Sequence, residues 1–97
     1  MVVINKLIWD EFNVDHIAQH DVTMQDVEEV CQGELIVRQT YNSRLLITGL
    51  DSTGRLLSVV LALKGEGEYY VVTARPASRK ERQEYRQTKE GGEEHDD

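Results

Sequence analysis

The feature that most constrains this chain of 97 residues is a long apolar stretch, Leu56 to Leu63, between two turn signals. Asp51-Ser52-Thr53-Gly54 precedes the stretch and Gly65-Glu66-Gly67 follows it, and both are rich in residues that favour tight turns. An apolar run of this length predicts a central strand that is covered on both faces of a sheet. Because the turns are short, we expect its neighbours to pair with it as antiparallel hairpins.

Three more segments of the same half of the chain have strand patterns. Leu35 to Arg38 and Arg44 to Leu50 precede the apolar stretch, and Glu68 to Ala74 follows it. Each contains β-branched residues, which are common in strands. The four segments together predict an antiparallel meander, and Val2 to Trp9 is apolar enough for a first strand.

Two helices are predicted between the first strand and the meander. Asp10 can cap a helix over Glu11 to Gln19, and Thr23 with Asp26 makes a cap for a second helix that ends near Gly33. With a third helix at the C-terminal end, these elements predict an α+β domain: an antiparallel β-sheet meander with two N-terminal helices and one C-terminal helix.

The C-terminal helix follows the last strand directly. Pro76 cannot continue a β-ladder and sets the backbone for a turn. Ser78 and Glu81 have the spacing of a capping box, which predicts a helix from Ser78 to Gln87 and gives Glu81 a role as a cap.

The first turn of this helix carries positive charge where the helix dipole disfavours it. Arg79, Lys80 and Arg82 lie there, and each unfavourable cation costs roughly 0.3–1 kcal/mol. Sites that break local rules are often functional, and N–H groups beside guanidiniums attract anions such as phosphate. The alternative is a solvated helix whose arginines pair with Glu81 and Glu84.

Charge is distributed unevenly along the chain. The net charge of −7 argues against a generic nucleic-acid-binding protein, because phosphate contacts supply most of that affinity. Residues 71–89, however, contain six basic and two acidic residues, whereas residues 1–40 contain two basic and eight acidic ones. We therefore expect one basic surface on an acidic molecule.

Composition also bounds the domain count and the compartment. The length indicates one domain, residues 1–88, and the acidic residues 89–97 have no apolar side chain, which predicts a disordered tail. One cysteine, Cys31, excludes an internal disulfide. No apolar stretch has the length of a signal peptide or a membrane span, so the expected location is cytoplasmic, without membrane association.

Motifs between Ile8 and Tyr85 occur in the order and spacing of one known family. They are Ile8-Trp9-Asp10, His20-Asp21-Val22-Thr23, Arg44 to Gly49, Gly54-Arg55-Leu56-Leu57, and Thr73-Ala74-Arg75-Pro76-Ala77-Ser78-Arg79-Lys80-Glu81-Arg82 followed by Tyr85. The set resembles the BrnT family of type II toxins, whose C-terminal signature is A-R-x-A-[ST]-x-x-E-R-x-x-Y. Gln19 replaces the family's Lys and Asp21 its Gly, so the chain resembles a divergent member.

This resemblance implies a RelE-like fold and the function of a toxin in a type II toxin-antitoxin system, an endoribonuclease that arrests growth. It also implies a BrnA-like antitoxin protein with a ribbon-helix-helix part, so that the toxin meets DNA only indirectly, through the antitoxin. The alternative is a non-catalytic binding module of the same fold, which docks a protein partner or a phosphate-bearing ligand on its arginine face.

A nuclease of this kind is expected to work without metal or other cofactors, through attack of the RNA 2′-OH on the adjacent phosphate. His16 and His20 have the i, i+4 spacing of a metal pair, but no third ligand has suitable spacing. The acidic residues are dispersed over two amphipathic helices, unlike a two-metal cluster.

The candidate site residues follow from this reaction. Arginines can stabilise the charge that builds on the phosphate, and a tyrosine, histidine or carboxylate can transfer protons. The catalytic candidates are Arg75, Arg79, Arg82, Tyr85, His20 and Glu81, and the candidates for RNA binding are Arg55, Lys80 and Arg86.

Overall fold

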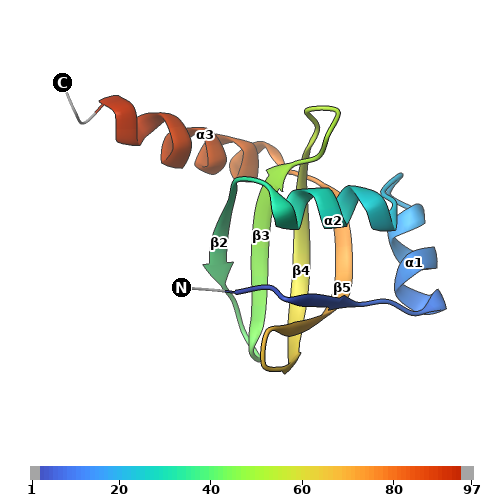
Figure 1. Cartoon of the computed structure of the whole chain (residues 1–97). Coiled ribbons are helices and arrows are strands. Elements are labelled where there is room, and N and C mark those ends of the chain that lie inside the picture. The colour runs from blue at the N-terminus through green and yellow to red at the C-terminus, as the bar shows by residue number, and fades with distance from the viewer. Residues whose placement is uncertain (1–2, 95–97) are drawn as a thin grey trace.

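A computed structural model describes residues 3–94, apart from the side chains of Gln39 and residues 90–94. This part of the chain forms one sheet and three helices (Figure 1). The elements are β1 (Lys6–Ile8), α1 (Glu11–Ala18), α2 (Met24–Gln32), β2 (Leu35–Gln39), β3 (Arg44–Leu50), β4 (Leu56–Gly65), β5 (Glu68–Pro76) and α3 (Arg79–Glu94). The α+β class and the predicted order of elements are confirmed.

The sheet has five strands in the order β1-β5-β4-β3-β2, with β4 at its centre. Strands β2 to β5 form the predicted antiparallel meander. The prediction of a wholly antiparallel sheet is wrong at one edge, because β1 pairs in parallel with β5 and places Leu7 opposite Tyr69. Helices α1 and α2 carry the chain from this edge to the far edge, where the meander begins, so no hairpin turn fixes the direction of β1.

Both N-terminal helices begin at the predicted caps. Asp10 and Asn13 form a reciprocal capping box, with both N–H···O distances at 2.9 Å. Thr23 and Asp26 do the same at the start of α2. Such caps satisfy N–H groups that have no partner within the helix, and each typically contributes about 1 kcal/mol.

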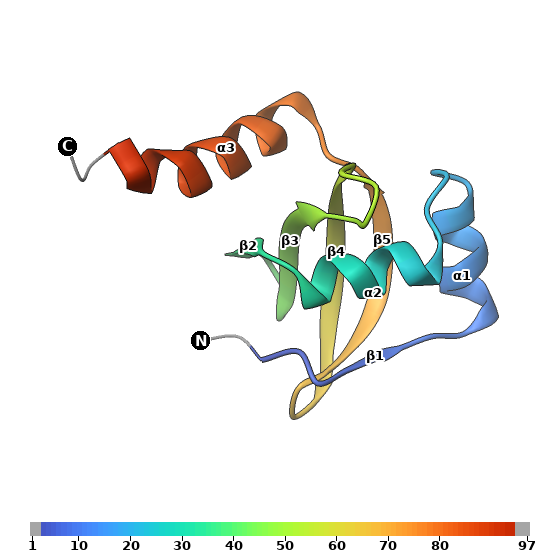
Figure 2. The ribbon, with the colours of Figure 1, turned by 45° about the horizontal axis from the view of Figure 1, so that its top comes forward.

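The hydrophobic core lies between the sheet and the first two helices (Figure 2). Ile17 of α1 and Val27 and Val30 of α2 are fully buried against β-strand residues such as Leu57. Burying side chains of this size contributes roughly 1.5–3 kcal/mol each. Helix α2 approaches β3 closely at Gly49, where an added Cβ would lie 3.2 Å from Val30 Cγ1, so a side chain there would crowd the helix.

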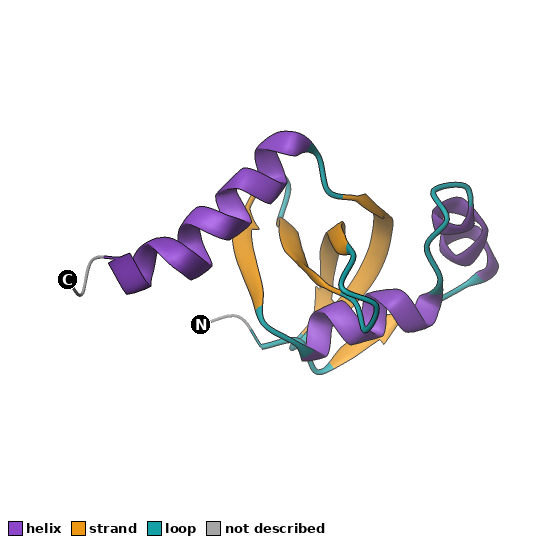
Figure 3. Ribbon diagram, turned by 90° about the horizontal axis from the view of Figure 1, so that it is seen from above, coloured by secondary structure: helices purple, strands orange, loops and turns teal. Residues whose placement is uncertain are grey.

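Helix α3 lies on the opposite side of the sheet from α2 (Figure 3). Glu81 and Tyr85 on the inner face of the helix are buried, and so is Ala77, which precedes the helix. The helix continues to Glu94, past the end predicted at Gln87.

The segment of residues 89–94, which was expected to be disordered, thus continues this helix. Lys and Glu are good helix formers, so a lack of apolar residues does not by itself end a helix. The Lys89 ammonium lies 3.8 Å from the carboxylate of Glu34, beside the start of β2. Residues 95–97 of the predicted tail lie outside the described residues.

Candidate functional site

The junction of β5 and α3 is held by one carboxylate, that of Glu81. The Arg75 guanidinium binds it with two bonds of 2.7 and 2.9 Å. The hydroxyl of Ser58 and the N–H of Ser78 each donate to the same carboxylate at 2.8 Å. The hydrogen bonds from Arg75 outweigh the effect of burial and, with those from Ser78 and Ser58, lower the pKa of Glu81 to about 2.

Glu81 is therefore ionised at neutral pH and is a weak proton acceptor. The predicted capping box is confirmed, since Glu81 N–H also donates to the Ser78 hydroxyl at 3.2 Å. The predicted catalytic role of Glu81 as a proton carrier is at odds with these contacts, because all of them stabilise the charged form.

The outer face of α3 carries three arginines that, unlike Arg75, are not bound to Glu81. Arg79, Arg82 and Arg86, with Gln83, line an open depression of about 590 Å³. The three arginines form no ion pair with any side chain that the structure describes, whereas Glu81 binds Arg75 and Glu84 binds Arg38. The alternative of arginines neutralised by Glu81 and Glu84 therefore fails for Arg79 and Arg82.

We call Arg79, Arg82 and Arg86 the outer arginines. All three are exposed, as is Lys80, so their charges are available to an anion. Guanidiniums bind phosphate oxygens through paired N–H donors. The predicted anion-binding arginines of α3 thus lie together on one accessible surface, whereas Lys80 is exposed but does not line the depression.

Tyr85 lies on the other side of the same helix. Its ring is buried, and its hydroxyl donates to the Glu34 carbonyl at 3.3 Å. Burial raises the pKa of the Tyr85 phenol. The predicted catalytic role of Tyr85 is at odds with this position, because its side chain anchors α3 to the start of β2 and faces away from the outer arginines.

His20 follows α1, which lies beside β5 and not beside the body of α3 (Figures 1 and 3). Its ring packs edge-on against that of His16, with 5.6 Å between the ring centroids. The structure therefore separates His20 from the outer arginines. Among the side chains that the structure describes, no group of three or more His, Cys, Asp or Glu residues could hold a metal ion.

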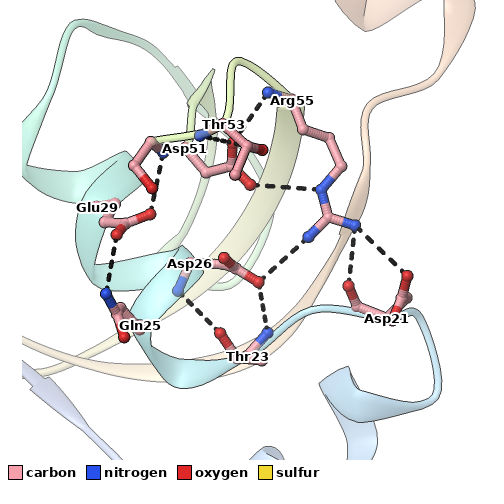
Figure 4. Close-up of polar contacts among 9 residues, drawn as sticks. Asp21, Thr23, Gln25, Asp26, Glu29, Asp51, Thr53 and Arg55 are labelled. Atoms are coloured by element: carbon pink, nitrogen blue, oxygen red, sulfur yellow. Dashed lines mark hydrogen bonds and ion pairs between the residues drawn. The ribbon is translucent and has the colours of Figure 1, made fainter.

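Arg55 is surrounded by carboxylates (Figure 4). Its Nη2 atom lies 3.2 Å from Asp26 Oδ2, and its Nε atom lies 3.4 Å from Asp51 Oδ2. Its Nη1 group donates to the Asp21 carbonyl at 2.9 Å. Burial alone would raise the pKa of Asp51, but hydrogen bonds from Thr53 and Arg55 outweigh it and lower that pKa. The predicted RNA contact of Arg55 is at odds with this setting, because its charge already joins the β3–β4 turn to the start of α2.

The sheet has a second candidate surface that sequence reasoning missed. Residues 58, 60 and 62 alternate along β4 and point away from the core, and we call the side of the sheet that they share the open face. Ser58 pairs with Arg75 and Val60 with Thr73 across β4 and β5. Ser58 is covered by α3, whereas Val60, Ala62 and Thr73 are half-buried.

The prediction that Leu56 to Leu63 is covered on both faces is thus correct only near Ser58. A sheet with one uncovered side normally shows apolar residues alternating with polar ones. The open face carries apolar residues such as Val60 and Ala62, so β4 shows no such alternation. The open face also receives the His16 side chain from α1, which no local pattern in the sequence indicates.

One solved structure with the same arrangement is a ribonuclease toxin, BrnT of Brucella abortus. The two chains are 27% identical and superpose with a TM-score of 0.62, over 76% of this chain and 97% of the toxin chain. The chain is a divergent BrnT-like protein. No protein-family model matches its sequence, and neither does any curated protein.

The BrnT-like chain carries its signature residues at the junction of β5 and α3, so the resemblance predicted from the motifs is confirmed by the fold. The match supports a toxin-like function. Within residues 3–94, none of the helices is both long and apolar enough to span a membrane.

Proposed function

We propose that this BrnT-like chain is the toxin of a type II toxin-antitoxin pair and that it cleaves RNA as a metal-independent endoribonuclease. The match to a ribonuclease toxin carries this proposal. The outer arginines support it, because no carboxylate in the part of the chain that the structure describes neutralises their positive charge.

In the proposed reaction, the outer arginines and Lys80 bind the phosphates of a single RNA strand. The 2′-oxygen of one nucleotide attacks the adjacent phosphorus, the bond to the 5′-oxygen breaks, and a cyclic phosphate and a free 5′-hydroxyl remain. Charge builds on the non-bridging oxygens during the attack, and the accessible part of the Arg75 guanidinium, two residues from Thr73 on β5, stabilises it. Loss of one such donor typically raises a barrier by about 2.7–4 kcal/mol.

Proton transfer then falls to the exposed histidines. Glu81 and Tyr85 are both engaged in structural contacts, whereas His20 is exposed and remains a candidate. Arg75 keeps part of its surface accessible, with 38% of its side chain exposed, although Glu81 binds it.

The proposed partner is a BrnA-like antitoxin that covers the outer arginines with an acidic segment. Charge complementarity favours this, because the outer arginines lack described acidic partners on their own chain. The test is binding of the cognate antitoxin to the triple alanine variant of Arg79, Arg82 and Arg86. Unchanged affinity would place the interface elsewhere.

The test of the activity compares a single-stranded RNA with the deoxy strand of the same sequence, each with and without EDTA. We expect cleavage of the RNA alone, unchanged by the chelator. Arg79→Ala and Arg82→Ala should each weaken RNA binding and so raise KM, and the effect should depend on the salt concentration. Lys64→Ala, which removes an exposed cation from β4, is the matched control and should leave the rate unchanged. Loss of cleavage in EDTA, or cutting of the deoxy strand, would contradict the mechanism.

The binding module remains the second candidate, and a specific observation favours it. Two of the three proton-transfer candidates, Glu81 and Tyr85, are held in structural roles. RNA or antitoxin binding to the outer arginines without cleavage, and without growth arrest on expression, would identify the chain as such a module.

A further inference from the structure

His16 of α1 reaches the open face of the sheet. Its Nε2 atom lies 3.1 Å from the Thr73 hydroxyl oxygen on β5, although the two residues are 57 positions apart in the sequence. Helix α1 lies alongside β5 in two views (Figures 1 and 2). His16 is exposed, so an imidazole is accessible at the border of this face.

A guanidinium lies on the same face, two residues further along β5. Thr73 pairs with Val60 and Arg75 with Ser58, and β4 alternates regularly between these two positions. Thr73 and Arg75 therefore point to the same side of the sheet, roughly 7 Å apart along the strand. A phosphate between them would meet both the accessible part of Arg75 and the imidazole of His16.

A second imidazole completes the group. The ring of His20 packs edge-on against His16, with 5.6 Å between centroids, and is also exposed. Of the other titratable groups beside α1 and β5, the Tyr70 hydroxyl donates to Asp10 at 3.0 Å and Glu81 is bound by Arg75, whereas Glu11 and Asp15 are exposed on α1. Histidine is the side chain best suited to accept and donate protons near neutral pH.

We propose that His16 is the proton acceptor and His20 the proton donor of RNA cleavage on the open face, an inference that rests on the proposed function. If His16 Nε2–H donates to Thr73, its Nδ1 atom is free to take the proton of the 2′-hydroxyl. The 2′-oxygen then bonds to phosphorus as the bond to the 5′-oxygen breaks. His20 gives a proton to that leaving oxygen. His16 thus takes up one proton and His20 releases one.

In this assignment Thr73 is a positioning residue. Its hydroxyl fixes the orientation of the His16 ring, and the outer arginines hold the rest of the RNA strand. A purely structural His16, which only ties α1 to β5, would affect stability but would not shape the dependence of the rate on pH.

The first experiment measures the rate of RNA cleavage against pH for the full chain and three variants. We expect His16→Gln to lower the rate about 100- to 10,000-fold and to abolish the rise of the rate on the acidic side. His20→Gln should abolish the fall on the alkaline side. Thr73→Val, which keeps the shape of the side chain and removes the hydroxyl, should lower the rate less than His16→Gln. It should keep both the acidic and the alkaline side of the pH profile. Asp15→Asn, at an exposed position of α1, is the matched control and should cleave like the unaltered chain.

The second experiment does not depend on turnover. The imidazole resonances of His16 and His20 are followed by NMR while a 2′-deoxy version of the RNA, which cannot be cleaved, is added. We expect both rings to shift, and the shift to persist in Thr73→Val.

The outcomes separate the two proposals. If the unaltered chain cleaves RNA and His16→Gln cleaves with the same rate and pH profile, the assignment of His16 is overturned and the nuclease stands. If the rings do not respond to the RNA analogue while cleavage occurs, the open face is not the site. If the unaltered chain cleaves no RNA, the proposed function fails and the assignment fails with it.

Discussion

Two sets of arginines in this molecule have opposite surroundings. Arg55 and Arg75 each bind carboxylates that lie close by, Asp26 and Asp51 for the first and Glu81 for the second. The outer arginines of α3 face solvent and have no ion pair with a described side chain. The same side chain therefore serves two purposes, and the neighbouring acids decide which: paired arginines join elements of the fold, and unpaired ones are available to a ligand.

The strongest way to break this contrast is to remove the acid that holds Arg75. Glu81→Ala should lower the free energy of unfolding by about 3 kcal/mol, because it leaves a partly buried guanidinium, the Ser58 hydroxyl and the Ser78 N–H without their acceptor. Urea denaturation followed by circular dichroism measures this. A loss below about 0.5 kcal/mol would mean that Arg75 is not held by Glu81.

The same carboxylate predicts an acid-sensitive fold. Because the folded state lowers the pKa of Glu81 from its ordinary value of 4.5 to about 2, its contribution to stability is complete above pH 4.5 and is lost as the pH falls toward 2. The stability difference between the unaltered chain and Glu81→Gln should therefore shrink over that interval. A difference that stays constant between pH 5 and pH 2.5 would contradict this assignment.

Arg55→Met tests the other paired arginine. It should lower the free energy of unfolding by about 2 kcal/mol, since hydrogen bonds to charged groups contribute roughly 1.5–3 kcal/mol and the change leaves Asp26 and Asp51 unpaired. RNA cleavage per folded molecule should not change. A large loss of RNA affinity in a folded Arg55→Met protein would restore Arg55 as an RNA contact.

Arg38 and Glu84 offer an intermediate case, an ion pair at the surface between β2 and α3. Arg38→Ala should cost only about 0.2–1 kcal/mol, because solvent and salt weaken exposed pairs. The effect should decrease further in 0.5 M salt, where the screening length is well under about 8 Å. Thermal unfolding at two salt concentrations measures both quantities.

The outer arginines should contribute least to stability. Substituting Arg79, Arg82 or Arg86 with Ala should change the free energy of unfolding by no more than about 0.5 kcal/mol. Each substitution should instead reduce the salt dependence of RNA binding, by about 0.7 in the slope of log K against log salt concentration. Destabilisation of the size expected for Arg55→Met would remove the contrast between the two sets.

Local patterns predicted the parts of the molecule that depend on neighbouring residues. The helix caps at Asp10, Thr23 and Ser78, the meander and the helix that carries the outer arginines were all predictable from residues within a few positions of one another. The motifs that resemble BrnT toxins added the fold.

The errors came from contacts between distant segments. The parallel pairing of β1 with β5, and the contacts of Arg55 with Asp21 and Asp26, join residues far apart in the chain. The inward position of Tyr85 depends on which side of α3 meets β2, which the charged sequence of that helix does not indicate. His16 and Thr73 are a further such pair, and only the packing of α1 beside β5 brings them together.

The outer face of α3 also bears on how the binding specificity of related proteins can change in evolution. Its arginines rest on a helix that is fixed from the other side, by Ala77, Glu81 and Tyr85. Substitutions on the outer face should therefore leave the folding of the protein intact, so related chains can come to bind different ligands there while keeping the fold. What this face of α3 binds can in this way differ between related chains of the same stability.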